Sequence, residues 1–146
     1  MKRNNVFFSS NLIVMLALIY SCSRPTQHSN AEIEQAMNNY DSLIVKQDAG
    51  AIANAFTPGG KLGDVATGRA DIQNKLSQIK GFKVIEQSSV TNGIQIKGDS
   101  ALHTGTYIQR NVNAKNDTIK AQGTFVCKWK WTDEGWKIDH IVTRPF

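Results

Sequence analysis

The residues best suited to chemistry are two histidines and a tyrosine in strand-like segments of the C-terminal half. In segment 101–110, His103 and Tyr107 share one face, and in the last such segment His140 shares a face with Ile138. If the apolar Phe125 and Ile138 faces are concave, His140 points into the cavity that they line. An imidazole exchanges protons near neutral pH, and a phenol donates a hydrogen bond to a developing oxyanion. The competing interpretation is that all three are core residues whose polar atoms form hydrogen bonds with the backbone.

Three further residues are candidates for lining such a cavity. Tyr40 lies on the apolar stripe of the first predicted helix, and Trp129 shares a strand face with Phe125. Asp64 lies in the glycine-containing loop 60–68, where an aspartate commonly serves turn chemistry. Core packing is the alternative role for Tyr40. Together with His103, Tyr107 and His140, these residues form the candidate binding set.

No metal, organic cofactor or disulfide is expected. The three histidines are scattered, and no paired Cys/His spacing indicates zinc. Cys127 has no partner once Cys22 is lipidated, and its strand position is typical of a buried small hydrophobe. Segment 57–61 lacks phosphate-loop spacing, and Ser88 lacks the glycines of a nucleophile elbow.

The elements that must position these side chains change in kind along the chain. A helical period begins at Ala31, with Asn30 as N-cap, and further helices are predicted at 49–56 and 69–79. Branched and aromatic residues then predict strands, separated by turns at 92–93, 98–99 and 133–135. The predicted strands span residues 82–90, 94–97, 101–110, 119–131 and 136–142.

Helices followed by antiparallel strands predict an α+β domain. We expect a cone-shaped, curved antiparallel sheet of about five strands, wrapped around the N-terminal helices, with a cavity at the open end.

The order of these elements, with several local patterns, resembles the nuclear transport factor 2-like superfamily, which includes ketosteroid isomerases and SnoaL-like cyclases. The patterns are the helix exit at 56–60, Gly68 with Ile72, segment 98–107, and the closing hairpin 129–141. The resemblance covers about 31–143 and implies a homodimer formed through the sheet. From the positions of Ala101 and Gly105, it also implies that His103 and Tyr107 point into the cavity. No acid clearly falls on the isomerase base position, and this fold hosts enzymes, binding modules and assembly domains alike.

The N-terminal residues predict export and lipid anchoring. Residues 1–21 combine Lys2 and Arg3 with an apolar run too short to cross a bilayer, as in a removable signal peptide. Cys22 follows a lipobox-like sequence, from which Tyr20 departs; the alternative is an ordinary secretory signal. We expect a flexible tether at 22–30, with His28 in solvent, and one domain at 31–146. The protein would then sit in the cell envelope, on the membrane's periplasmic or outer side, held only by lipid.

The charge pattern argues against nucleic acid as a partner. The formal charge of +5 is mild, and the basic residues are dispersed.

The sequence leaves three hypotheses for function. The first is a lipid-anchored pocket domain that binds a small apolar or amphipathic ligand or mediates dimer or partner assembly. The alternative is a cofactor-independent isomerase, dehydratase or cyclase acting by proton transfer. The third is a surface adaptor that uses Lys128 and Lys130.

Overall fold

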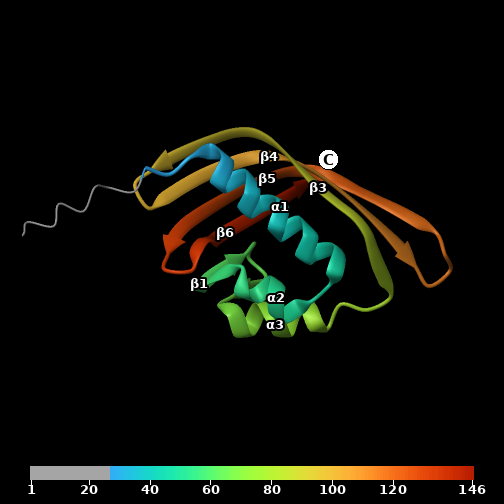
Figure 1. Cartoon of the computed structure of the whole chain (residues 1–146). Coiled ribbons are helices and arrows are strands. Elements are labelled where there is room, and N and C mark those ends of the chain that lie inside the picture. Colours follow the sequence, from blue (N-terminus) through green and yellow to red (C-terminus); the bar gives the residue numbers. More distant parts are fainter. Residues whose placement is uncertain (1–26) are drawn as a thin grey trace, which may run out of the picture.

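Three helices form one layer of the protein in the computed structural model, which describes residues 27–146 (Figure 1). They are α1 (Asn30–Lys46), α2 (Ala49–Asn54) and α3 (Arg69–Ser77). The N-cap of α1 is Ser29, one residue before the expected Asn30, and its hydroxyl accepts a hydrogen bond from the Glu32 amide. No helix within residues 27–146 has both the length and the apolar content that a bilayer crossing requires.

A curved six-stranded sheet forms the second layer, and the predicted α+β architecture is confirmed (Figure 1). The spatial order is β2-β1-β6-β5-β4-β3. Neighbouring strands from β3 to β6 are antiparallel, whereas β1 pairs in parallel with β6. The strands are β1 (Phe56–Leu62), β2 (Ala66–Thr67), β3 (Phe82–Lys97), β4 (Ser100–Asn113), β5 (Thr118–Thr132) and β6 (Gly135–Pro145).

Two segments differ from their predicted structure because of local backbone packing. Residues 56–62 were expected to end a helix and enter a loop, but they form β1. Gly60 fits there because a Cβ atom would lie 2.8 Å from the Ile138 carbonyl oxygen of β6. Asn92 and Gly93 were expected to form a turn, but β3 continues through them with a register irregularity between Thr91 and Gly93.

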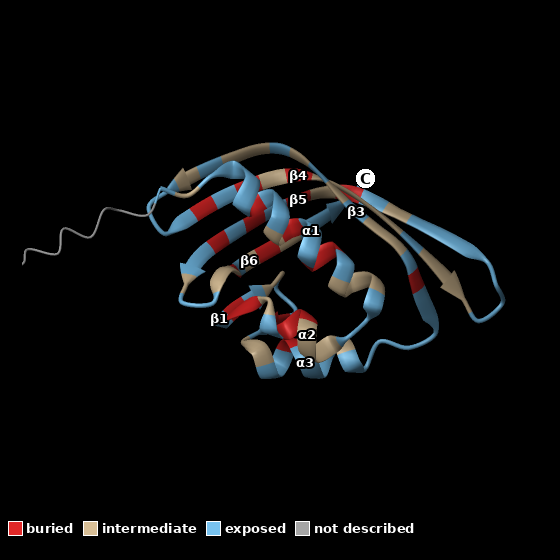
Figure 2. Ribbon diagram, viewed as in Figure 1, coloured by how far each residue is buried: buried red, intermediate tan, exposed pale blue. Residues whose placement is uncertain are grey.

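The core lies between the helices and the concave face of the sheet (Figure 2). Cys127 belongs to it with no exposed surface, as predicted, and burial raises the pKa of its thiol. A thiol that stays protonated is a poor nucleophile. The largest fully buried side chains are Ile33, Phe56, Ile72, His103, Cys127 and Ile138.

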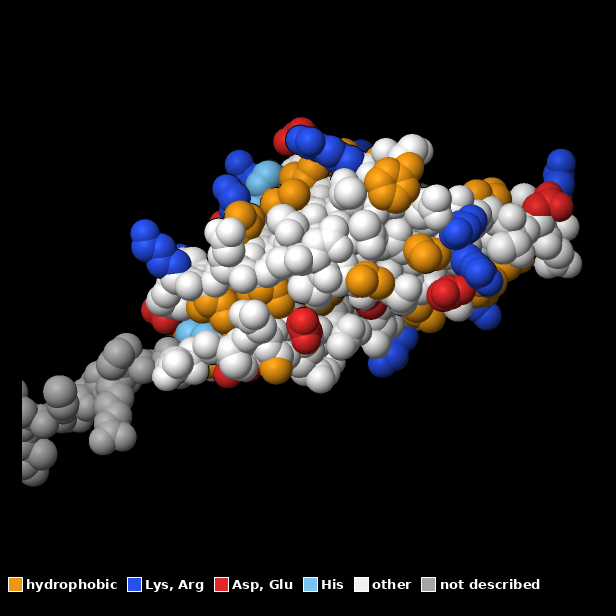
Figure 3. Space-filling model, turned by 90° about the horizontal axis from the view of Figure 1, so that it is seen from above, with side chains coloured by type: hydrophobic (Ala, Val, Ile, Leu, Met, Phe, Trp, Pro, Cys, Tyr) orange, Lys and Arg blue, Asp and Glu red, His pale blue; other side chains and the backbone are white. Residues whose placement is uncertain are grey.

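The other side of strands β3–β6, turned away from α1, is called the outer face. It exposes several apolar side chains, including Val90, Leu102 and Val126. The view from above shows apolar side chains at the surface in several places among polar ones (Figure 3). Isolated exposed apolar residues are ordinary, but a group on one sheet face can mark an interface.

The chain immediately before α1 is docked on the domain. His28, expected in solvent, has a side chain only 1% exposed. Its ring centroid lies 4.4 Å from that of Trp131 and 4.7 Å from that of Trp136. Its Nδ1 is 3.0 Å from the Glu32 carboxylate. The expected signal peptide, Cys22 and the first part of the tether lie outside the described residues.

Candidate functional site

A cavity of about 470 Å³ lies between α1, the turn joining β1 to β2, and the concave face of the sheet. We call it the cone cavity. Its volume falls within the range of small-molecule sites. Apolar side chains from α1, β1 and β6 line much of it. The polar and aromatic side chains that matter for chemistry are Tyr40, Asp41, Asp64, Gln87, Tyr107 and Phe125.

Tyr40 is held in place by helix packing. The residue is 7% exposed, and its ring meets Phe56 edge to face, with centroids 6.0 Å apart. Burial, and then the neighbouring Cys127 and Asp41, raise the pKa of the Tyr40 phenol. The phenol therefore stays protonated at neutral pH and can donate a hydrogen bond.

Asp41 is a site residue that sequence reasoning missed. Its carboxylate accepts hydrogen bonds from Gln87 Nε2 at 3.1 Å and Ser89 Oγ at 3.0 Å, both on β3. Burial raises the pKa of Asp41, and these two hydrogen bonds act in the opposite direction. The available signal was its helical position, since an aspartate four residues after Met37 interrupts the apolar stripe.

Two of the other predicted residues reach the same cavity. Tyr107 is half-buried on the concave face of β4, and Asp64 is exposed in the turn between β1 and β2. With Tyr40, these residues bring two phenols and one carboxylate to one cavity. Asp64 supplies an acceptor near solvent, and the phenols supply donors.

His103 does not line this cavity. The residue has no exposed surface, its Nε2 lies 3.0 Å from Thr91 Oγ1, and its ring meets Phe125 at 90°. Burial lowers the pKa of His103 to about 4, so the imidazole is neutral at physiological pH. The structure therefore places His103 in the core, as the competing interpretation held, but its buried Nδ1 has no hydrogen-bond partner within residues 27–146.

His140 points to the opposite side of the sheet from the one expected. The register of β5 against β6 shifts between Lys128 and Trp129, so that Trp129 pairs with Ile138 but Lys128 pairs with His140. The extra residue, Asp139, interrupts the alternation of successive β6 side chains between the two faces of the sheet. His140 therefore shares the outer face with Lys128, and the expectation that it faces the cavity is wrong.

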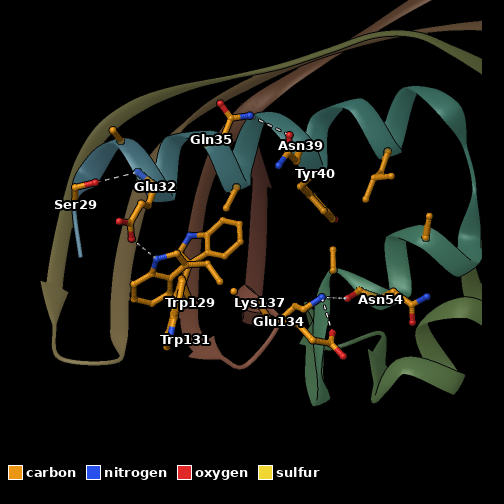
Figure 4. A pocket seen from close by; sticks show the side chains of 17 residues that line it. Ser29, Glu32, Gln35, Asn39, Tyr40, Asn54, Trp129, Trp131, Glu134 and Lys137 are labelled. Carbon is orange, nitrogen blue, oxygen red and sulfur yellow. Dashed lines mark hydrogen bonds and ion pairs between the residues drawn. The ribbon is translucent and has the colours of Figure 1, made fainter. Parts of the chain in front are cut away.

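Trp129 lines a second, larger opening of about 960 Å³, beside the N-terminal half of α1 (Figure 4). We call it the tryptophan groove. Tyr40 contributes to both this groove and the cone cavity. The predicted candidates are thus divided between two sites. Residues of the groove that carry chemistry are Gln35, Asn39, Asn54, Trp129, Trp131 and Trp136.

The polar groups of the cone cavity suit an organic ligand. Within residues 27–146, no three His, Cys, Asp or Glu side chains lie together as metal ligands would. The cone cavity combines neutral hydroxyl donors, a carboxylate at its edge and apolar walls. Such an arrangement can orient a small molecule through one or two polar atoms and can exchange a proton with it.

Comparison with known proteins identifies related folds. A family model described as a SnoaL-like domain matches residues 26–142. No curated protein matches the chain significantly.

Solved structures resemble the fold closely. A Mycobacterium tuberculosis protein of unknown function has a TM-score of 0.71 at 17% identity, covering 80% of this chain and 70% of that one. A ketosteroid isomerase-like protein from Erwinia carotovora has a TM-score of 0.69 at 18% identity, with 80% and 95% covered. A nuclear transport factor 2-like superfamily protein from Salmonella enterica has a TM-score of 0.65 at 18% identity, with 79% and 89% covered. At these identities the likeness concerns the fold.

Proposed function

Because the chain belongs to the SnoaL-like domain family, we propose that its cone cavity binds a small, mostly apolar molecule carrying one oxygen-containing polar group. The observation that carries this proposal is the convergence of Tyr40, Tyr107 and Asp64 on one cavity of about 470 Å³. Pockets of this size and mixed lining are the usual form of small-molecule sites.

The cavity's polar groups suggest how the ligand is oriented. The Tyr40 hydroxyl, protonated because burial raises its pKa, can donate to a carbonyl or hydroxyl oxygen. Asp64, at the exposed edge, can accept from a ligand hydroxyl. Asp41 is already bonded to Gln87 and Ser89 and so fixes the wall between α1 and β3.

Binding is tested with 2-naphthol, a neutral two-ring molecule with one hydroxyl group. We expect it to raise the melting temperature of the protein and to shift NMR signals around the cone cavity. Tyr40→Phe removes only the hydroxyl and should weaken binding about tenfold, the effect of one buried hydrogen bond. Ser88→Ala, which removes an exposed hydroxyl on the outer face, is the matched control. Equal affinity in both variants contradicts the proposed orientation, and absence of binding contradicts the proposed ligand class.

A second candidate function is proton transfer in the same cavity, without an organic cofactor. The observation in its favour is that one carboxylate, Asp64, and one protonated phenol, Tyr40, line the same space. Asp64 would take a proton from a carbon beside a ligand carbonyl. The C–H electron pair would become the enolate double bond, and Tyr40 would hydrogen-bond the enolate oxygen. Asp64 would then return the proton to another carbon.

This second candidate is tested by hydrogen–deuterium exchange at the carbon acid 2-tetralone in D₂O. The protein should accelerate loss of the signal from the protons beside the carbonyl, and Asp64→Asn should abolish that acceleration. Asp48→Asn, which alters the α2 cap, is a control expected to retain it. Exchange that persists in Asp64→Asn removes Asp64 from the mechanism.

We further propose that the cavity works outside the cytoplasm, on a lipid anchor at Cys22. The signal-like residues 1–21 and the following cysteine support this location. A fatty-acid analogue should label the wild-type protein but not Cys22→Ser. Unlabelled wild-type protein in the medium contradicts the anchor and indicates ordinary secretion.

A homodimer that forms through the outer face is also proposed. Its support is the exposed apolar surface on β3–β5, which includes Val90, Leu102 and Val126. Two copies that covered this surface would leave both cavities on the concave faces accessible.

A further inference from the structure

The tryptophan groove is separate in composition from the cone cavity. All three tryptophans of the chain line it, from β5 and β6. Amide side chains line it as well, two of them from α1 and one from the end of α2. Figure 4 shows Gln35 and Asn39 bonded to each other on α1, at the edge of the helix that is turned away from Trp129 and Trp131. The groove therefore has one aromatic side and one amide-bearing side, where these two amides lie at the rim.

The aromatic side is rigid. Trp131 and Trp136 meet edge to face, with centroids 5.5 Å apart at 72°. The Trp136 indole N–H donates to the Glu32 carboxylate at 3.1 Å, and His28 packs against both rings. Trp131 nevertheless keeps 36% of its surface exposed. Part of one indole is thus held firmly and remains available to a ligand.

Trp129 adds an indole N–H that lacks a partner within residues 27–146. The residue is only 3% exposed and forms part of the groove wall. An unpaired buried donor carries a cost in free energy, and most buried indole N–H groups find an acceptor. A ligand oxygen that reached the Trp129 indole N–H from the groove would provide that acceptor.

The amide-bearing side offers neutral hydrogen-bonding groups. Gln35 Nε2 donates to Asn39 Oδ1 at 3.0 Å, which leaves the Asn39 amino group and the Gln35 carbonyl oxygen for other partners. The groove's one lysine, Lys137, is bound to Glu134 at 3.0 Å and to the Asn54 backbone oxygen at 3.0 Å. With Glu32 also present, no excess positive charge favours an anion.

We propose that the tryptophan groove binds a neutral saccharide. Sugar rings present C–H groups on their faces and hydroxyl groups around their edges. The C–H faces match an exposed indole, and the hydroxyl edges match neutral amides and an unpaired indole N–H. A purely apolar ligand would leave the amides unpaired, and an anion would find no free cation among the groove residues that the structure describes. This site does not depend on the ligand proposed for the cone cavity.

Tryptophan fluorescence tests this inference directly, because every tryptophan of the chain lies in the groove. The probe is N,N′,N″-triacetylchitotriose, a neutral, flat trisaccharide whose acetamido groups can pair with Gln35 and Asn39. Titration of the full protein into the millimolar range should give a saturable change in tryptophan emission. Isothermal titration calorimetry provides an affinity independent of the optical signal.

Two variants locate the binding. Trp131→Ala removes the exposed indole and should weaken binding at least about tenfold. Asn39→Ala alters an exposed helix position on the opposite side and should weaken it by about threefold to tenfold. Asp64→Asn, in the cone cavity, is the matched control and should bind the trisaccharide as the wild type does. Circular dichroism verifies that each variant is folded.

The outcomes against the proposal are distinct. No saturable response from folded wild-type protein overturns it, as does unchanged affinity in Trp131→Ala. A response abolished only by Asp64→Asn would move the trisaccharide to the cone cavity and likewise overturn it. Binding of 2-naphthol or of an unstructured peptide in the groove, without binding of the trisaccharide, would assign another ligand class. Failure of 2-naphthol to bind the cone cavity leaves the saccharide site untouched.

Discussion

His103 is buried in the core and does not line the cone cavity, where proton transfer was expected of it. The imidazole lies in the core beside Phe125 and Thr91, where its charged form would lose hydration. Asp41 is the converse case, because no role was expected of it and yet it lines the cone cavity. Its buried carboxylate accepts hydrogen bonds from Gln87 and Ser89. Side-chain type and strand phase identified both faces of β4. They could not distinguish a packed histidine from a cavity histidine, because that depends on how closely β3 and β5 pack around it.

The depressed pKa of His103 predicts acid destabilisation. The pKa is about 4 in the folded protein and near 6.5 when unfolded. Unfolded chains therefore bind the proton first as the pH falls, and stability is lost between about pH 6.5 and pH 4. Urea unfolding at pH 7 and pH 4.5 measures the free energy of unfolding at each pH. The decrease between the two pH values should be about 2 kcal/mol larger in the wild type than in His103→Gln.

Thr91→Val is the control for this experiment. It removes the 3.0 Å contact with Nε2 but keeps the imidazole buried, so its pH dependence should follow the wild type even if its stability at pH 7 is lower. If His103→Gln loses as much stability in acid as the wild type, another group causes the pH dependence.

Among the elements, regular periodicity was predictable and local irregularity was not. The stripe of α1 and the alternation in β4 follow from residue types alone. The extra residue near Asp139, which turns His140 to the outer face, has no glycine or proline to indicate it. β1 was missed because Pro58, Gly59 and Gly60 are typical of turns, whereas Gly60 here allows the close approach of β6.

The docked segment before α1 supports a prediction about that helix. His28 packs on Trp131 and Trp136 and contacts Glu32, so His28→Ala removes aromatic contacts and one hydrogen bond at the helix start. We expect a decrease of about 1–2 kcal/mol in the free energy of unfolding, measured by urea titration. Gln27→Ala, at the exposed preceding position, should change it by less than about 0.5 kcal/mol. Equal effects would indicate that the His28 contacts contribute little in solution.

In the molecule as a whole, α1 lies between two of the openings on the concave side of the sheet. Tyr40 lines both, so α1 separates the cone cavity from the tryptophan groove. The sequence predicted a single cavity because the strand faces were assigned as one surface. It could not reveal where α1 would cross that surface. Both openings lie on the concave side, which leaves the outer face free for assembly.

The proposed dimer makes a prediction at this scale. Val126 is 43% exposed on the outer face, where it pairs with Val142 of β6 and Thr104 of β4. A lysine at this position would have to be desolvated when two outer faces meet, so Val126→Lys should raise the dimer dissociation constant at least about tenfold. Sedimentation equilibrium measures this change. Val65→Lys, at an exposed apolar position in the β1–β2 turn, should dimerise as the wild type does. A monomeric wild type at high concentration, or equal dimerisation of both variants, would place any assembly elsewhere than on the outer face.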